Sequence, residues 1–437
     1  MENFSSVGIQ VPHVLLPHPA IDHKNWAVVA CDQYTSQPEY WYTVEKLIGD
    51  APSTYNMILP EAYLGKKNEA QHASRVLPAM QNYLRGNIFR SIEGFILVER
   101  SFNGVTRLGL MAALDLEEYD FSPASNSLIR ATEGTILDRL PPRIAIREEA
   151  ELEIPHILVL IDDPDKTVIE PLKQTALKAD ILYDFELMQD SGHLTGYLVN
   201  PERHAGIVDA LTKLKSSKVQ SAKYFVNPDT PPLLYAMGDG NHSLATAKAV
   251  WEKNKNSLPK DHPSRYALVE IENLHDESIV FEAIHRLLKG IHIDLLSACS
   301  DHFSQSVSFD RFPDFDALAA TVDLDLNGSQ KFGVIQEEDL FLVTLTDPEH
   351  TLTVGNVQHW LDQLLAQDFI EEIDYIHGAD TIHKLGRMND HAGIYLPAMP
   401  KNALFRSVIK DGPLPRKTFS MGEAHQKRFY MECRKIK

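Results

Sequence analysis

The chain reads LLYAMGDGNHSLATAK from Leu233 to Lys248: an apolar run, a Gly-Asp-Gly turn and then a run of good helix formers. This order predicts a strand, a tight loop and a helix. The first turn of such a helix has unbonded backbone N–H groups and the positive end of the helix dipole, so an anion such as a phosphate is a natural ligand there. Asp239 and His242 would lie at the same place. We therefore expect the chemistry of this chain to centre on this turn.

The composition places the chain among soluble globular proteins. Of its 437 residues, 43% are hydrophobic and 24% are charged, and this length is typical of about two or three domains. The net charge of −19 argues against a nucleic-acid-binding surface, which needs a basic patch to displace counterions. We expect a small-molecule or nucleotide ligand and no nucleic-acid partner. The sequence leaves the oligomeric state open.

Cysteine usage and hydropathy indicate a cytoplasmic protein. The three cysteines are widely separated, with no CxxC pair and no zinc-type spacing, as is usual in a reducing compartment. The N-terminus lacks the basic and apolar regions of a signal peptide. No apolar run approaches the length of about 18 residues that a membrane span needs.

The periodicity of the chain predicts an α+β fold with mixed sheets, flanking helices and two lobes. We expect a first lobe over residues 1–290 and a second, α/β lobe over 291–437. The last strand, 428–436, could pair back into either lobe. Further expected elements are a hairpin (94–100 with 106–116), a strand pair (181–187 with 193–199) and helices (69–84, 166–178 and 201–214). The stretch from Val280 to Leu288 fits either a helix or a strand.

The N-terminal histidines do not form a predicted metal site. His13, His18 and His23 recur every five residues, which is not the spacing of one helical face, and the neighbouring prolines exclude a helix. We expect an extended surface arm there.

Four segments of the chain, in order, resemble motifs of a bacterial family, the domain-of-unknown-function 1015 family. They are Arg130-Ala131-Thr132-Glu133-Gly134-Thr135 with the downstream Asp138-Arg139, Gly238-Asp239-Gly240-Asn241-His242-Ser243, Ile284-His285-Arg286-Leu287-Leu288, and Pro415-Arg416-Lys417-Thr418-Phe419. The second segment is neither a P-loop nor a dinucleotide fingerprint, since it lacks the residues that either requires.

The family in turn is similar, distantly, to the ParB and sulfiredoxin superfamily. There a Gly-x-x-Arg turn at a helix N-terminus holds nucleotide phosphates, some relatives are small-molecule kinases such as a free-serine kinase, and others hydrolyse CTP. The resemblance therefore implies a ParB/sulfiredoxin-like element here. This chain has Asn241-His242-Ser243 where the family has His-His-Arg, so the guanidinium that would clamp a phosphate is missing.

Residue chemistry and the resemblance together assign candidate roles. Backbone N–H groups of the turn would hold phosphate, and Arg130, Arg286 or Lys417 would replace the missing guanidinium, since cations suit phosphate oxygens. Asp239 and Glu133 would hold Mg²⁺ or accept a hydroxyl proton, and His242 would transfer a proton. The remaining candidate contacts to a nucleotide are Gly238, Gly240, Asn241, Ser243, Thr135, His285 and Thr418.

Each assignment has a structural alternative. The turn could be an ordinary strand-to-helix connection that Asn241 caps, Asp239 could bond its own backbone, and Arg130 with Glu133 could form an ion pair. Two functions follow. The first is a phosphotransferase or nucleotide hydrolase that uses a nucleotide, with Mg²⁺ as a possible cofactor. The alternative is a non-catalytic ligand-binding or regulatory protein that has lost the phosphate clamp.

Overall fold

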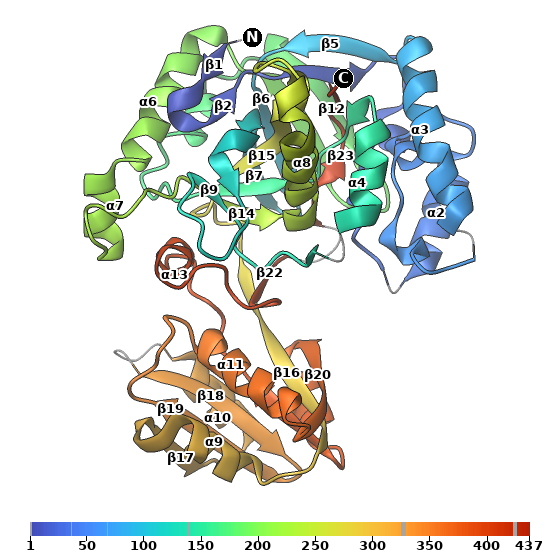
Figure 1. Ribbon diagram of the computed structural model, residues 1–437. Helices are drawn as coiled ribbons and strands as arrows, with labels where there is room; N and C mark the ends of the chain where they lie inside the picture. Colours follow the sequence, from blue (N-terminus) through green and yellow to red (C-terminus); the bar gives the residue numbers. More distant parts are fainter. Residues whose placement is uncertain (1, 36, 68, 138–139, 325–328, 423–425) are drawn as a thin grey trace. The chain divides into compact units, whose positions relative to one another are not determined.

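The computed structural model describes the whole chain except residues 1, 36, 68, 138–139, 325–328 and 423–425 (Figure 1). It consists of two compact units, Met1–Ile279 together with Gly422–Lys437, and Val280–Met421. The predicted Asp138-Arg139 pair lies outside the described residues. Within the described part, several sheets and 13 α-helices make up a mixed α/β structure, which confirms the α+β class. No helix of that part is long and apolar enough to cross a membrane.

The first unit is built on one large mixed sheet. The order of its main path is β12 (Ile181–Glu186), β13 (His193–Leu198), β6 (Ile96–Phe102), β7 (Val105–Asp115), β15 (Tyr266–Asn273), β11 (Leu158–Ile161), β14 (Tyr235–Asp239), β9 (Ile129–Arg130) and β8 (Tyr119–Asp120). Strand β1 (Asn3–Phe4) pairs with β2 (Ile9–Gln10), which joins β7. The predicted hairpin β6–β7 and pair β12–β13 are both antiparallel, whereas β11–β15 and β14–β9 are parallel.

Alternate residues of the central strands build a core on each face of this sheet, as the two-residue period of a strand requires. On β7, Met111 joins one core, and Leu110 and Ala112 join the other. The first core includes apolar residues of α2 (Pro38–Ile48) and α3 (Glu69–Arg85). The second core includes residues of α5 (Glu170–Thr175), α6 (His204–Leu214) and α8 (Asn241–Asn254). Each fully buried large apolar side chain contributes about 1.5–3 kcal/mol.

The other α-helices in the described part of this unit are α1 (His23–Trp26), α4 (Leu140–Glu149) and α7 (Ser217–Tyr224). The helix expected over 166–178 is wrong in extent, because only Glu170–Thr175 is α-helical and Lys178 begins a separate 3-10 turn. The Asp163 carboxylate accepts hydrogen bonds from the N–H groups of Thr167 and Val168 at 2.6 and 2.9 Å. These bonds hold the preceding residues in a turn.

The C-terminal segment returns to the first unit. Strand β23 (Phe429–Tyr430) pairs with β4 (Val28–Val29), and β24 (Arg434–Lys435) pairs with β10 (Leu152–Glu153). The N-terminal arm is extended, and its strand β3 (His13–Pro17) pairs with β5 (Phe89–Glu93). His13 and His18 are exposed as expected, but the apolar residues of β3 enter the core, so the arm is not wholly on the surface. The exclusion of a helix was wrong at His23, which begins α1.

The second unit has its own sheet, in the order β17 (Val307–Arg311), β19 (Asp339–Leu345), β18 (Gln330–Gln336), β21 (His391–Tyr395), β16 (Phe281–Ile291) and β20 (Ile370–His377), with β22 (Phe419–Met421) also paired to β16. Its helices are α9 (Leu295–Phe303), α10 (Phe315–Asp323), α11 (Thr353–Ala366), α12 (Ala379–Gly386) and α13 (Ala403–Asp411). The ambiguous stretch is thus a strand, β16. It is paired on both sides and mostly buried, so no alternating polar pattern marks it in the sequence.

Candidate functional site

The turn between β14 and α8 has the predicted strand–loop–helix geometry. Gly240 is the residue before the helix, with φ of 77°, and its carbonyl accepts hydrogen bonds from the N–H groups of Ser243 and Leu244 at 2.9 and 3.0 Å. A Cβ at Gly240 would lie 3.1 Å from the Ile157 backbone, so glycine is required there. No side chain caps α8. The alternative that Asn241 caps the helix is therefore wrong, because Asn241 is already its first residue.

Asp239 carries the best-defined charge at this turn. The N–H of Gly240 donates to Asp239 Oδ1 at 2.7 Å, and Lys427 Nζ lies 3.3 Å from Asp239 Oδ2. Burial alone would raise the pKa of Asp239, but Lys427, His156 and the Gly240 N–H outweigh burial and hold this pKa below its ordinary value. Asp239 is therefore an ionised carboxylate at neutral pH.

A second acid, Glu272 on β15, has a pKa shifted in the opposite direction. Its side chain has no solvent exposure, and its only charged partner within salt-bridge distance in the described part of the chain is Arg107, at 2.8 Å. Burial, with Asp276 and Asp239 nearby, raises the pKa of Glu272 against the opposing effect of Arg107. Two interacting carboxyl groups whose pKa values are pushed apart are the usual arrangement of an acid and a base in one site.

The segment after β9 lies along the same turn. Strands β9 and β14 are parallel, with Arg130 opposite Ala236. Beyond the pairing, Thr132 Oγ1 donates to the carbonyl of Met237 at 2.7 Å, and the Ile136 N–H donates to His242 Nε2 at 3.3 Å. The structure thus brings the segment that contains Glu133 and Thr135 to the turn.

The polar side chains around the first turn of α8 include two oxygens without a partner in the described part of the chain and one row of hydrogen-bonded side chains. Thr135 Oγ1 and Asn241 Oδ1 are shielded from solvent and have no hydrogen-bond partner among the described residues, a state that folded proteins mostly avoid. Ser243 Oγ lies 3.3 Å from His156 Nε2, and His156 Nδ1 lies 2.8 Å from the Tyr430 hydroxyl. Ser243 therefore already has a protein partner.

Arg130 does not reach the turn. Its side chain is buried, and its guanidinium donates to the carbonyls of Ser127 and Pro231, each at 2.9 Å. Pro231 precedes β14, whereas the turn follows β14, so the guanidinium lies at the other end of the strand. Burial lowers the pKa of Arg130. The expectation that Arg130 clamps a phosphate at the turn was wrong, because backbone carbonyls take its donors.

The other four predicted contacts lie in the second unit. His285 Nδ1 accepts a hydrogen bond from the Leu396 N–H at 3.1 Å, and Arg286 donates to Gln358 Oε1 at 2.7 Å. Thr418 Oγ1 donates to a backbone carbonyl of its own loop at 2.6 Å, and Lys417 is exposed. These four residues and the turn belong to different units, so their joint role at one phosphate stays a prediction.

The expected magnesium site has no protein cage. Among the described residues, no group of three or more His, Cys, Asp or Glu side chains could hold a metal ion. Both Asp239 oxygens already have partners, the Gly240 N–H and Lys427. A Mg²⁺ held by Asp239 and nucleotide phosphates would have to displace one of these partners. The magnesium site stays a prediction, and we assign no step to the ion.

Comparison of the sequence with protein-family models gives one decisive match, to the family described as "Protein of unknown function (DUF1015)", over residues 15–364. The chain belongs to the DUF1015 family. No curated protein matches this DUF1015 sequence at a significant level.

Solved structures resemble this DUF1015 protein only weakly. A mutant free serine kinase in complex with AMP shares 11% identity, with a TM-score of 0.39, over 75% of this chain and 92% of the kinase chain. A conserved hypothetical protein from Pyrococcus furiosus shares 13% identity, with a TM-score of 0.35, over 75% and 95% of the two chains. Truncated SbnI from Staphylococcus aureus shares 11% identity, with a TM-score of 0.35, over 72% and 82%.

Sequence reasoning missed two residues at the turn of the DUF1015 chain, Lys427 and His156, and also Glu272, which interacts electrostatically with Asp239. Lys427 and His156 reach Asp239 and Ser243 from segments distant in sequence, and no local pattern marks them. Glu272 did carry a signal, because β15 reads YALVEIEN, and two acids inside a buried strand are unusual.

Proposed function

We propose that the first unit binds the phosphate of a nucleotide at the N-terminus of α8, and that the chain is a phosphotransferase or nucleotide hydrolase. The start of α8 carries this proposal. The helix has 14 residues, begins after a positive-φ glycine, and has neither a side-chain cap nor an acidic residue in its first turn. Such a terminus presents N–H donors and a positive dipole to an anion.

Lys427 supplies the positive charge that the absent arginine would have supplied. Its ammonium lies 3.3 Å from Asp239 and is mostly buried, at 14% side-chain exposure. A phosphate bound at the turn would share the Lys427 ammonium with the Asp239 carboxylate. Partial burial strengthens such a charge pair relative to one in bulk water.

Asp239 and Glu272 provide the acid–base chemistry. Asp239 is the ionised partner, so it accepts a proton from an attacking hydroxyl or water, while Glu272, whose pKa burial raises, interacts with it electrostatically from β15. Phosphoryl transfer needs positioning and charge more than covalent catalysis, so this limited set of groups is sufficient.

A thermal-shift screen with nucleoside mono-, di- and triphosphates, with and without Mg²⁺, tests the proposal. We expect a rise in the unfolding temperature of the wild-type chain, reduced in Lys427→Met. The matched control is Lys253→Met in the last turn of α8, whose ammonium pairs with Glu148 at the surface. The absence of any shift at about millimolar nucleotide would refute phosphate binding at this site.

A non-catalytic binding role is the second candidate. It is favoured by the contacts of His242 Nε2 and Ser243 Oγ, which are both satisfied within the protein. This role predicts nucleotide binding without product. Incubation with labelled nucleotide, followed by product separation, distinguishes the two functions. Product formed by the wild type and lost in Asp239→Asn supports the enzyme, whereas binding without product supports the non-catalytic role.

A further inference from the structure

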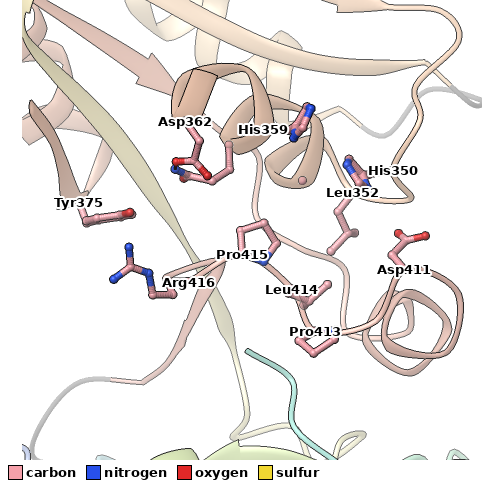
Figure 2. Close-up of a pocket in the computed structure, with 12 residues that line it drawn as sticks. His350, Leu352, His359, Asp362, Tyr375, Asp411, Pro413, Leu414, Pro415 and Arg416 are labelled. Carbon is pink, nitrogen blue, oxygen red and sulfur yellow. Dashed lines mark hydrogen bonds between the residues drawn. The ribbon is translucent and has the colours of Figure 1, made fainter. Parts of the chain in front are cut away.

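The second unit contains a pocket of about 270 Å³ that plays no part in the proposed phosphate site (Figure 2). Its walls come from α11 and the segment before it, from Tyr375 on β20, and from Asp411 at the end of α13 with the loop 413–416. The volume is just below the range of about 300–1,000 Å³ for drug-sized ligands. The pocket therefore suits a small metabolite.

A buried side chain holds these walls together. Arg286 has no solvent exposure, and it donates to Gln358 Oε1 at 2.7 Å and to the Arg416 carbonyl at 3.4 Å. Its guanidinium also lies 4.7 Å from the centre of the Tyr375 ring, a cation–π contact. One buried residue thus positions the helix, the strand and the loop that line the pocket.

The polar groups that line the pocket include donors without acceptors. Within the ranges that the structure describes, no residue accepts a hydrogen bond from the Arg416 guanidinium or from the Tyr375 hydroxyl. Figure 2 shows these two groups on the same side of the pocket, with Asp362 near them. A guanidinium and a hydroxyl on one wall are suited to bind a carboxylate.

The negative groups exclude a polyanion from this pocket. Asp362 and Asp411 line it together with Arg416, so formal negative charge outnumbers formal positive charge. The Gln358 side-chain amide donates to Asp362 Oδ1 at 2.8 Å, which orients the carboxylate and leaves its second oxygen for a cationic donor. Among the described residues of the second unit, no ion pair joins Asp362 to Arg416.

We propose that this pocket binds a small zwitterion of the α-amino-acid type. The ligand carboxylate binds Arg416 and Tyr375, and its ammonium group binds Asp362. Its apolar part packs on Leu352 and Leu414, which line the same pocket. This binding is independent of the phosphate site, because every lining residue belongs to the second unit.

Isothermal titration calorimetry on the full chain tests the proposal. The probes are the common L-α-amino acids, the corresponding carboxylic acids without the amino group, the corresponding amines without the carboxyl group, and inorganic phosphate. We expect at least one amino acid to bind with a Kd of about 1 mM or tighter. Both single-charge analogues should bind at least about tenfold more weakly, equivalent to about 1.4 kcal/mol.

Substitutions locate the binding. Arg416→Gln and Asp362→Asn should each weaken the binding of the same amino acid by about tenfold. Lys410→Gln on α13 and Asp301→Asn on α9 should leave its affinity unchanged. All four positions are exposed, and a urea melt verifies that each variant is folded. Absence of amino-acid binding, equal binding of a single-charge analogue or of phosphate, or binding that survives both pocket substitutions would each overturn the proposal.

Discussion

The two buried arginines of the family-like segments, Arg130 in the first unit and Arg286 in the second, behave alike. Arg130 donates to backbone carbonyls before β14, and Arg286 donates to a glutamine and to backbone carbonyls around β16. The cations that line the candidate sites are other residues, Lys427 and Arg416. A motif arginine can thus hold a loop in position, while another cation is the one placed to bind the ligand.

Burial explains this division of roles. A guanidinium keeps its charge at all accessible pH values and has five donors, so burial requires nearby acceptors for those donors. Once carbonyls supply them, few donors remain for a phosphate. Arg416 is exposed and Lys427 keeps 14% side-chain exposure, so their donors are not all required by protein acceptors and can bind a ligand.

Removal of the buried arginine should have the largest effect. Arg286→Met leaves Gln358 and two carbonyls without their donor, and we expect a loss of about 3 kcal/mol in the free energy of unfolding. Arg416→Met, the matched exposed position, should cost less than about 0.5 kcal/mol. Urea denaturation of both variants measures the difference. Equal losses would contradict the distinction between buried and ligand-facing arginines.

The neighbouring His285 should make the second unit sensitive to acid. Burial, then Arg286 and His377, lowers the pKa of His285 to about 4, and the Leu396 N–H donates to its unprotonated Nδ1. The unfolded chain binds this proton more readily, so stability is lost as the pH falls below about 6.5, by up to about 3 kcal/mol.

Urea unfolding at about pH 7 and about pH 4, in the wild type and in His285→Phe, measures this contribution. The substitution should reduce the difference in unfolding free energy between the two pH values. The same difference in both proteins would show that His285 is not the group responsible.

Glycine at the α8 turn should matter more than glycine within a helix. Gly240→Ala places a Cβ 3.1 Å from Ile157 at a positive φ, and we expect a loss of about 1–2 kcal/mol with weaker nucleotide binding. The control, Gly206→Ala inside α6, meets nothing within 4 Å and should stabilise the chain by about 0.5–1 kcal/mol. Thermal and urea melts of both variants test this contrast, which fails if Gly240→Ala is neutral.

The smallest expected change is a shift in the titration of Asp239. Lys427→Met removes a charge that lowers the pKa of Asp239, so this pKa should rise. The stability that the depressed pKa contributes is present above the unfolded value and is lost as the pH falls through the folded value. Carboxyl-carbon NMR follows the titration, with Lys255→Met as the control. An unchanged Asp239 pKa in Lys427→Met would show that the Lys427 charge does not stabilise the Asp239 carboxylate.

Local patterns predicted the fold class, the β6–β7 hairpin and the strand–turn–helix around Gly240, because alternation, turn residues and helix formers act over a few residues. They failed at β16, where burial on both sides removes the alternation. They also failed at Lys427 and His156, since both depend on chain segments that meet only after folding. The roles of Arg130 and Arg286 depended on burial, which their motifs do not encode.

The central claim is that phosphate binds at the N-terminus of α8 beside Lys427. A crystal structure of the wild-type chain soaked with ADP tests this claim most directly. We predict density for a phosphate within hydrogen-bond distance of the N–H groups of Asn241 and His242, with Lys427 Nζ in contact. A nucleotide bound elsewhere, or an unoccupied turn at saturating ADP, would contradict the claim.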